Sequence, residues 1–441
     1  MLSEKNRHAR AERANNADRA STGPVAETVC VVGLGYIGLP TAAMLASRGY
    51  IVKGCDINRY AVESVNIGQP YFNEPDLQML LSAAVKTGQL EAFLSPKPAD
   101  YFIIAVPTPF ADDKQPDLSH IDSACSAIAP YLVNGNVVIL ESTSPVGTTE
   151  RIARALGTAR PDLRIARYKD AESEPDVFVC HCPERVLPGR MLTELVSNDR
   201  LVGGMTDECA ARAKKLYESF ARGQIFTTDC RTAEFVKLIE NAYRDVNIAF
   251  ANELSFLSER FDIDVWNAIA LANRHPRVDI MQPGPGVGGH CIAVDPWFLV
   301  AGAPDLARII RVARDTNDAK PQWVIDKVVQ MTGKLKHAIV ACFGLAYKPD
   351  VDDLRESPAV EIVRRLAEDK NTHILVVEPN VNALPQSLAA MPNVALADAK
   401  TAIQQADIVA LLVCHKQFGA LRTQSFFDKM VVDAVGLLRR S

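Results

Sequence analysis

The sequence lacks three features that would each point to a class of protein. No two of its ten cysteines are spaced as C-x-x-C, no segment is apolar over the length of a membrane span, and no long basic run occurs in the 441 residues. Paired zinc ligands, a membrane anchor and a basic nucleic-acid surface are therefore not indicated. With a net charge of −5, the composition predicts no nucleic-acid and no membrane partner.

The cysteines are placed as in a reduced protein. Cys30 and Cys342 lie inside apolar, strand-like runs, where a free cysteine packs as a small hydrophobic side chain. We therefore expect a cytoplasmic protein without a disulfide framework. The segment Cys180-His181-Cys182 is a possible metal cluster, but it lacks the usual ligand spacing and a second ligand pair, so we predict no metal.

The length of the chain exceeds what one hydrophobic core usually serves, so we expect two or three domains. Residues 1–27 are polar, highly charged and rich in alanine and arginine, and they contain no apolar core of a secretory signal. We expect a disordered or polar tail there, followed by an ordered fold from about Thr28.

Apolar runs alternate with helical stretches in the first half of the chain. The strand-like runs cover residues 29–38, 50–58, 101–109, 136–147 and 177–184. Strands that are apolar throughout and alternate with helices predict a parallel sheet covered on both faces. We therefore expect a Rossmann-like, doubly wound domain over residues 28–230.

A long helical segment follows this domain. Residues 232–263 have helical periodicity without glycine or proline, and the pattern is expected to continue through residues 263–274. We predict a central helical region over residues 231–333, of a length that suits a domain-bridging or dimer-forming helix.

The alternation of strands and helices returns near His337. The later strand-like runs cover residues 337–348, 373–380, 406–414 and 430–436. They predict a second, smaller doubly wound domain over residues 334–441. The fold class is therefore α/β, with two Rossmann-like doubly wound domains joined by a long-helix central region.

A glycine motif follows the first strand. Gly33, Gly35 and Gly38 form G-x-G-x-x-G between a strand and a helix, and Asp56 ends the next strand. Such glycines allow a tight turn, close approach of the pyrophosphate and helix packing, while the acid binds the ribose 2′-OH and repels a 2′-phosphate. The motif predicts NAD as cofactor, although a strand, turn and helix without ligand would share the pattern.

A second glycine-rich segment ends at a cysteine. Residues 282–291 read QPGPGVGGHC, and Asp295 follows four residues later. Such a loop can present the thiol to a ligand, and a thiol there can capture an aldehyde as a thiohemiacetal and later hold a thioester. Spacing alone leaves two interpretations open, a nucleophile and a buried cysteine in a tight turn.

Several stretches carry a resemblance to a known family. They are VVGLGYIGLPTAA, AVPTPF, ILESTSPVGTTE, CPERVLPGR, ENAYRDVNIAFANELS, NRHPRV, QPGPGVGGHCIAVDPWF and FGLAYKPDVDDLRESPA. Together they resemble the UDP-glucose/GDP-mannose dehydrogenase family from Thr28 to Gly436, and most of all its bacterial members that act on UDP-N-acetyl-D-mannosamine. The resemblance implies a homodimeric enzyme that oxidises the C6 alcohol of a nucleotide sugar to a carboxylate with NAD, and a UDP-sugar-binding role for the second domain.

The resemblance implies roles for the cysteine loop and the long helix. Cys291 matches the family nucleophile, and Asp295 matches the acid that helps to activate water. Lys237 and Asn241 match the pair that faces the sugar O6; at i and i+4 they share one helix face and can hold an alkoxide-like oxygen as hydride leaves. The charge of Lys237 is also expected to favour the Cys291 thiolate.

Further matches concern water and ligands. Thr143 matches the family's water-holding threonine, Glu184 a glutamate associated with thioester hydrolysis, and Arg277 an arginine that reaches the nucleotide of the partner subunit. The expected cofactor-binding residues are Gly33, Gly35, Tyr36, Ile37, Gly38, Asp56, Thr108, Thr143 and Arg355. The expected substrate-binding residues are Glu184, Arg185, Val186, Lys237, Asn241, Arg277, Gly288 and Lys348.

One departure narrows the substrate. Many UDP-glucose dehydrogenases carry a lysine just before the aspartate of the cysteine loop, whereas this chain has Val294. The loop and the long helix resemble enzymes for N-acetylated sugars instead. We therefore expect UDP-N-acetyl-D-mannosamine to be oxidised to UDP-N-acetyl-D-mannosaminuronate, a precursor for bacterial surface polysaccharide.

Three alternatives stay open. The same chemistry could act on UDP-N-acetylglucosamine, UDP-N-acetylgalactosamine or UDP-glucose, because one pocket contact can decide an epimer. A one-step hydroxyacid or hydroxyacyl dehydrogenase could share the fold, although Cys291 in its glycine loop argues against it. A non-catalytic nucleotide-sugar sensor should lack Cys291, Lys237 or Asn241, and all three are present.

Overall fold

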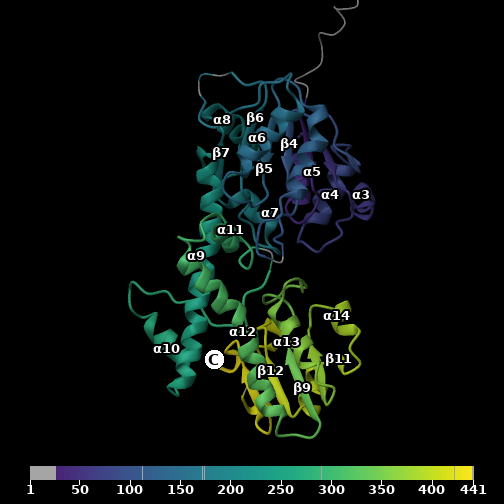
Figure 1. Ribbon diagram of the computed structural model, residues 1–441. Helices are drawn as coiled ribbons and strands as arrows, with labels where there is room; N and C mark the ends of the chain where they lie inside the picture. Colours follow the sequence, from purple (N-terminus) through teal and green to yellow (C-terminus); the bar gives the residue numbers. More distant parts are fainter. Residues whose placement is uncertain are drawn as a thin grey trace, which may run out of the picture.

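The computed structural model shows two α/β units joined by long helices (Figure 1). The residues that the structure describes are 26–111, 113–170, 172, 174–289, 291–421 and 423–439. The predicted tail over residues 1–27 therefore lies outside the described residues, except for residues 26 and 27.

The first unit is built on an eight-stranded sheet of order β3-β2-β1-β4-β5-β6-β7-β8. Its strands are β1 (Thr28–Val32), β2 (Ile51–Cys55), β3 (Leu90–Phe93), β4 (Tyr101–Ile104), β5 (Val137–Leu140), β6 (Phe178–His181), β7 (Arg200–Gly204) and β8 (Ile225–Asp229). All neighbours pair in parallel except β6 and β7, which are antiparallel. Because β4, β5 and β6 are buried at every residue, they appear in the sequence as continuous apolar runs.

Helices surround this sheet. They are α2 (Gly38–Ser47), α3 (Arg59–Asn66), α4 (Leu77–Lys86), α5 (Ser119–Ile128), α6 (Thr148–Ala159), α7 (Met191–Ser197) and α8 (Asp207–Glu218). The helix α2, which follows the glycine turn, is buried from Gly38 to Ala46, so it lies inside the core of the unit.

The second unit holds a five-stranded, fully parallel sheet of order β11-β10-β9-β12-β13. Its strands are β9 (Ala338–Phe343), β10 (Thr372–Val377), β11 (Val394–Leu396), β12 (Ile408–Leu411) and β13 (Met430–Asp433). Its α-helices are α13 (Pro358–Leu366), α14 (Gln386–Ala389) and α15 (Ala399–Gln405). The predicted α/β class with two Rossmann-like units is confirmed.

The two units repeat one set of contacts. In each, a glycine with a φ of +94° directly follows the first strand, Gly33 after β1 and Gly344 after β9. The amide N–H of the following residue donates to a carboxylate at the end of the second strand, Asp56 at 2.9 Å in the first unit and Glu378 at 2.7 Å in the second. The same strand crossover is thus built twice, which the sequence alone did not show.

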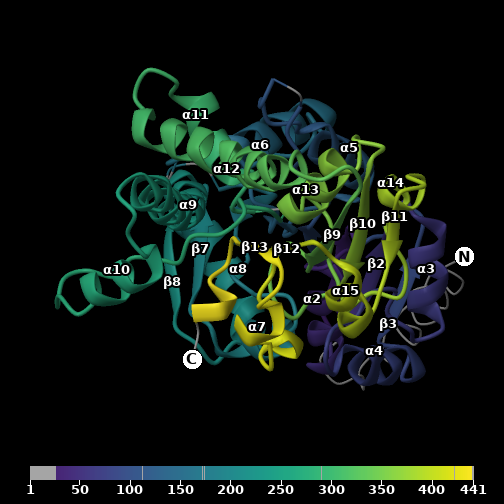
Figure 2. The same cartoon turned by 90° about the horizontal axis from the view of Figure 1, so that it is seen from below.

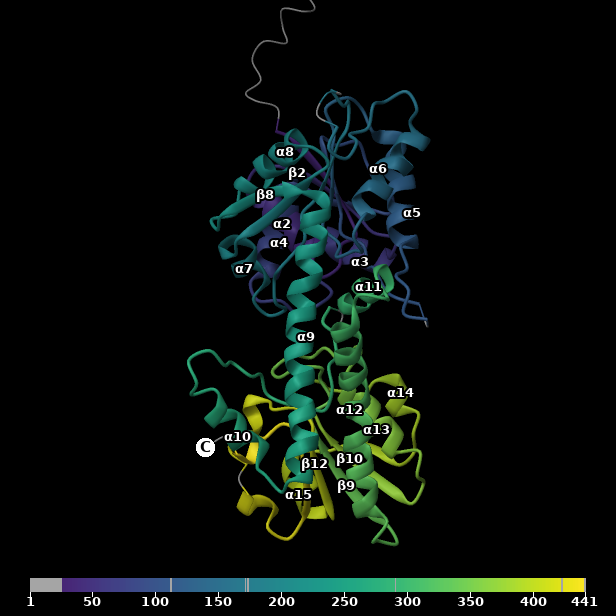
Figure 3. The ribbon, with the colours of Figure 1, turned by 60° about the vertical axis from the view of Figure 1, so that its left-hand side comes forward.

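Four helices form the central region. They are α9 (Cys230–Arg260), α10 (Val265–Ala272), α11 (Asp295–Gly302) and α12 (Arg308–Thr332). At 1.5 Å per residue, α9 is about 46 Å long, and it runs beside both α/β units with α12 alongside its lower half (Figure 3). Seen from below, the second unit lies against α12, while α10 projects on the other side of α9 (Figure 2).

The helical section continues through residues 263–274 as predicted, but as a separate helix, α10, after a break. The helix α9 ends at Arg260, and Asp262 has a φ of +55°, a left-handed conformation that a helix cannot contain. Asp264 then caps α10, because its side chain accepts the amide N–H groups of Trp266 and Asn267. Among the described residues, no helix is long and apolar enough to cross a membrane.

The second glycine turn yields a stability prediction. A Cβ at Gly344 would lie 2.3 Å from the Cβ of Val413, whereas Gly135 has a similar φ of +96° and no neighbour within 4 Å. Both Gly→Ala variants incur a left-handed backbone penalty of about 1–2 kcal/mol, and overpacking adds about 1–3 kcal/mol at Gly344 alone. We expect a larger drop in thermal midpoint for Gly344→Ala, measured by circular dichroism; equal drops would contradict the packing argument.

Candidate active site

The glycines of the first turn have different tasks. A Cβ at Gly33 would lie 2.6 Å from the carbonyl oxygen of Ala105, and one at Gly38 would lie 1.8 Å from that of Gly33. Around Gly35 nothing lies within 4 Å, so this position borders open space. Ile37, at the N-cap of α2, provides no side-chain hydrogen bond to the helix start, which leaves backbone N–H groups to receive an anion.

Asp56 stands beside this turn in a fixed orientation. Its carboxylate accepts the amide N–H of Leu34 at 2.9 Å and that of Asn58 at 2.8 Å. The residue is half-buried, at the end of β2. A fixed carboxylate here can accept a ribose hydroxyl and repel a 2′-phosphate, so the residues present fit NAD.

The other predicted cofactor residues lie along the same edge of the first sheet. Tyr36 stacks on Phe72 with ring centroids 4.3 Å apart, and Arg355 of the second unit places its guanidinium 4.7 Å from the Tyr36 centroid. The hydroxyl of Thr108 donates to the carbonyl oxygen of Thr143 at 2.5 Å. The structure thus brings the glycine turn together with Arg355, and joins Thr108 to Thr143.

The cysteine loop packs directly on the second unit. A Cβ at Gly288 would lie 2.3 Å from the carbonyl oxygen of Glu356, and one at Gly289 would lie 2.8 Å from the ring of Tyr347. Gly289 also has a φ of +85°. Because backbone and ring contact these positions so closely, the glycines are needed for packing as well as for backbone conformation.

Four of the predicted catalytic residues lie together where this loop passes α9. They are Cys291, Asp295, Asn241 and Lys237. Cys291 is the one cysteine of the ten that is classed as exposed. Its carbonyl oxygen accepts the amide N–H of Asp295 at 2.8 Å, and the carboxylate of Asp295 accepts Nδ2 of Asn241 at 2.5 Å. Lys237 and Asn241 are buried on α9, as their spacing predicts for a shared helix face.

The thiol is not poised as a thiolate in the free protein. Desolvation by the surrounding protein, and then the charge of Asp295, raise the pKa of Cys291 to about 11, although Lys237 and Lys348 act in the opposite direction. Lys237 does favour the thiolate, as expected, but its effect on the pKa is smaller than those of desolvation and Asp295. Burial also raises the pKa of Asp295 to about 6, against the opposing effects of Lys237 and Asn241.

The segment after β6 joins the first unit to α9. Glu184 is buried and accepts Nη2 of Arg200 at 2.8 Å. The guanidinium of Arg185 pairs with Glu240 on α9 at 2.6 Å, and Val186 packs against the core of the first unit. Arg200 and Glu240 were not predicted; the position of Glu240 between Lys237 and Asn241 was the available signal.

Two further predicted residues lie apart from each other. Lys348 is half-buried beside Tyr347, which touches the cysteine loop; burial and then the charge of Arg244 lower the pKa of Lys348. Arg277 is exposed in the loop after α10. Within the described part of the chain, Arg277 forms no hydrogen bond or ion pair with the other predicted site residues.

The fold and the first glycine turn define an NAD-dependent dehydrogenase built from two Rossmann-like units. Three domains of the UDP-glucose/GDP-mannose dehydrogenase family match the chain: the NAD binding domain over residues 27–221, the central domain over 231–319 and the UDP binding domain over 341–440. The chain belongs to this family. Its activity is that of an NAD-dependent nucleotide-sugar dehydrogenase.

Known relatives extend over nearly the whole chain. An NDP-N-acetyl-D-galactosaminuronic acid dehydrogenase from Ralstonia nicotianae is 56% identical over 93% of this chain and 96% of that protein. A UDP-N-acetyl-D-mannosamine dehydrogenase from Yersinia pestis is 52% identical over 94% and 99%. The solved UDP-D-ManNAc dehydrogenase of Pyrococcus horikoshii superposes with a TM-score of 0.82 at 36% identity, over 94% of this chain and 96% of that one.

The charges around Cys291 give a prediction on its reactivity. Asp295→Asn removes the charge that raises the pKa of Cys291, so the variant should react severalfold faster with iodoacetamide at pH 8. Since the pKa of Asp295 is about 6, the two rates should converge as the pH falls through that value. Mass spectrometry of the Cys291 peptide measures the rates.

The matched control is Asp315→Asn, which changes an exposed carboxylate on α12 and should leave the rate as in wild type. Lys237→Met should slow the reaction, because the ammonium lowers the pKa of the thiol. If Asp295→Asn and wild type react equally at pH 8, the electrostatic account of Cys291 is wrong.

Proposed function

We propose that the enzyme oxidises the C6 alcohol of a UDP-N-acetylhexosamine to the carboxylate, with Cys291 as covalent nucleophile. UDP-N-acetyl-D-mannosamine is the first substrate that we propose, and UDP-N-acetyl-D-mannosaminuronate the product. The main support is the exposed Cys291 on a tightly packed glycine loop, beside Asp295, Asn241 and Lys237.

The proposed reaction balances as one alcohol, two NAD⁺ and one water giving one carboxylate, two NADH and three protons. NAD, held at the first glycine turn and Asp56, would supply the hydride acceptor for each oxidation. Lys237 and Asn241 hold the developing alkoxide as the first hydride leaves C6, and the Cys291 thiolate then adds to the aldehyde. Loss of the second hydride leaves a thioester.

Hydrolysis of the thioester releases the acid and restores the thiol. Asp295, with a pKa raised to about 6, is suited to accept a proton from the attacking water. We assign Thr143 to holding this water and Glu184 to the same step. The raised pKa of Cys291 means that substrate binding, which brings Cys291 together with the carbonyl, must favour loss of the thiol proton.

The substrate residues suit a nucleotide sugar. Lys348 supplies a cation near the cysteine loop, which we assign to the diphosphate. We also assign Gly288, which packs against the second unit, to the sugar, together with Glu184, Arg185 and Val186 in the segment after β6. Arg277, exposed in the loop after α10, is assigned to the nucleotide of a partner subunit.

The identity of the sugar depends on its substituent at C2 and on its stereochemistry. Val294 and the similarity to dehydrogenases for N-acetylated sugars favour an acetamido group at C2. Because one relative is named for a galactosaminuronic acid and another for mannosamine, UDP-N-acetylgalactosamine is the second candidate. UDP-N-acetylglucosamine and UDP-glucose follow.

A substrate panel tests this proposal. UDP-N-acetyl-D-mannosamine should yield two NADH per sugar and a product of carboxylate mass, with much lower kcat/KM for its epimers and UDP-glucose. Cys291→Ser should still bind the nucleotide sugar in calorimetry and form no acid, whereas Cys414→Ser, a half-buried control, should behave as wild type. One NADH per substrate, or full acid formation by Cys291→Ser, would refute the covalent scheme.

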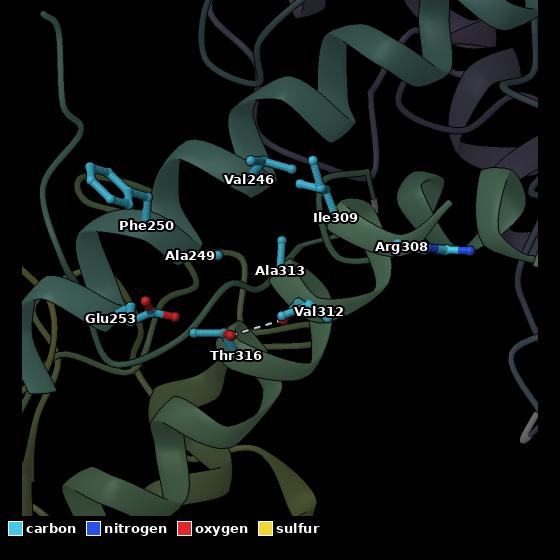
Figure 4. Close-up of a pocket in the computed structure, with 9 residues that line it drawn as sticks. All are labelled: Val246, Ala249, Phe250, Glu253, Arg308, Ile309, Val312, Ala313 and Thr316. Carbon is cyan, nitrogen blue, oxygen red and sulfur yellow. Dashed lines mark hydrogen bonds between the residues drawn. The ribbon is translucent and has the colours of Figure 1, made fainter. Parts of the chain in front are cut away.

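We also propose a homodimer formed through the central helices. Exposed apolar side chains line α9 and α12, among them Phe250, Ile309 and Val312. These side chains line a hollow of about 320 Å³ together with Val246 and Ala313, and Figure 4 shows the residues that surround it. An exposed apolar helix face of this kind usually packs against another protein surface. In a twofold dimer the faces of two copies would bury each other.

Light scattering coupled to gel filtration tests the dimer. Wild type should elute at twice the chain mass of 48.1 kDa, and Phe250→Glu should shift the protein toward monomer by placing a charge in the apolar face. Phe427→Glu alters an equally apolar side chain, 88% exposed and outside these helices, and should leave the dimer intact. A wild-type monomer at micromolar concentration would overturn the proposal.

The cellular setting follows from the same chemistry. A reactive Cys291 thiol and eight buried cysteines suit a reducing compartment. We therefore propose that the enzyme works in the cytoplasm, in synthesis of surface-polysaccharide precursors.

A further inference from the structure

A row of polar side chains is buried between α9 and α12, although this interface is otherwise apolar. The row is called the polar seam here. Its members are Asp245, Asn252 and Ser255 on α9, and Arg314, Asn317 and Lys320 on α12; each is at most 8% exposed. Burying such groups costs free energy unless each forms a hydrogen bond or ion pair. A function of the polar seam would explain why these residues are buried here.

The partners within the polar seam are incomplete. Nη1 of Arg314 donates to Oδ1 of Asp245 at 2.5 Å, but Oδ2 of Asp245 and Nε of Arg314 have no hydrogen-bond partner among the described residues. A partly satisfied buried ion pair is a poor source of stability compared with an apolar contact. Stability alone therefore does not account for the seam.

Hydrogen bonds lead from the acid to the cysteine loop. Nδ2 of Asn317 donates to Oδ1 of Asp245 at 2.8 Å, and Nδ2 of Asn252 donates to Oδ1 of Asn317 at 2.8 Å. Oδ1 of Asn252 then accepts the amide N–H of Gly284 at 2.9 Å. Gly284 lies seven residues before Cys291 in the glycine loop.

The acid sets the direction of this chain of amides. A carboxylate only accepts hydrogen bonds, so Asn317 must turn its NH2 group toward Asp245 and its oxygen toward Asn252. Asn252 must then offer its NH2 group to Asn317 and its oxygen to Gly284. A flip of either side-chain amide, that of Asn317 or that of Asn252, would lose at least two hydrogen bonds. The Asn252 oxygen that accepts the N–H of Gly284 is therefore held in one orientation.

We propose that Asn252, oriented by Asn317 and Asp245, is a positioning residue that fixes the glycine loop and thereby the Cys291 thiol. The same helix α9 carries Lys237 and Asn241, so one rigid element sets both the thiol and the groups that face it. On its other side the loop rests on Tyr347 and the second unit. The proposal rests on Cys291 being the reacting thiol.

The test replaces Asn252 by leucine, which has a similar volume and no acceptor for Gly284. We expect kcat to fall by about 10- to 100-fold with an unchanged KM for NAD, because a small displacement of a reacting group has effects of this size. Alkylation of Cys291 by iodoacetamide at pH 8 should become at least severalfold faster, because a released loop relieves the desolvation that raises the pKa of the thiol.

Two variants serve as controls. Ser255→Ala removes the acceptor of the Lys320 ammonium, 2.6 Å away, and so weakens the polar seam without touching the loop. Asn247→Leu changes another α9 asparagine, which donates to the carbonyl oxygen of Tyr243. Both should keep kcat and the alkylation rate within about twofold, even where Ser255→Ala lowers the thermal midpoint as much as Asn252→Leu.

Each outcome decides the proposal. Wild-type kcat and alkylation rate in Asn252→Leu would overturn it, and so would an equal loss of kcat in Ser255→Ala, which would indicate general softening of the helix pair. If Cys291→Ser makes acid normally, the covalent scheme fails, but the alkylation rate of Asn252→Leu still reports whether Asn252 holds the loop.

Discussion

The packing of α9 against α12 is the constraint on which the rest of the site depends. The helix α9 leaves the first unit at Cys230 and runs beside the second, and α11 and α12 lead from the cysteine loop to β9. Arg185 of the first unit pairs with Glu240 on α9, and the loop before α11 touches Tyr347 of the second. Any shift between α9 and α12 would therefore move the thiol relative to Lys237.

Close approach of backbones is the second constraint, and it explains why glycine clusters where chemistry occurs. At Gly33 and Gly38 the neighbour is the chain itself, whereas at Gly288 and Gly289 it is the second unit. Of the three glycines in the first turn, Gly35 is the one that borders open space. The glycine patterns could be recognised in the sequence because close packing of this kind admits no side chain. The sequence did not show which of these glycines faces a ligand, because that depends on the tertiary structure.

Local regularity governs what the sequence could predict. Buried strands such as β4 and β5 are continuous apolar runs, and α9 has uninterrupted helical periodicity, so both were found. Four strands were missed. The strand β8 is half-buried or exposed throughout, β3 and β11 have only four and three residues, and β7 ends in two glycines, so none of them is a long apolar run. The contact of Asn252 with Gly284 joins residues 32 apart through tertiary packing, and no local pattern encodes it.

The two units share one strand crossover, but their residues at the turn differ in a way that suits only the first unit to a dinucleotide. In the second unit, Nδ1 of His415 accepts the amide N–H of Asp350, so its proton lies on Nε2, which donates to Glu378 at 3.0 Å. With Leu345, Ala346 and Asn380 also donating to it, Glu378 is buried and has no acceptor free for a ribose, whereas Asp56 is half-buried. Ala346 and Pro349 replace the second and third glycines, and no helix begins at Pro349. The shared scaffold therefore keeps its dinucleotide cradle in the first unit alone.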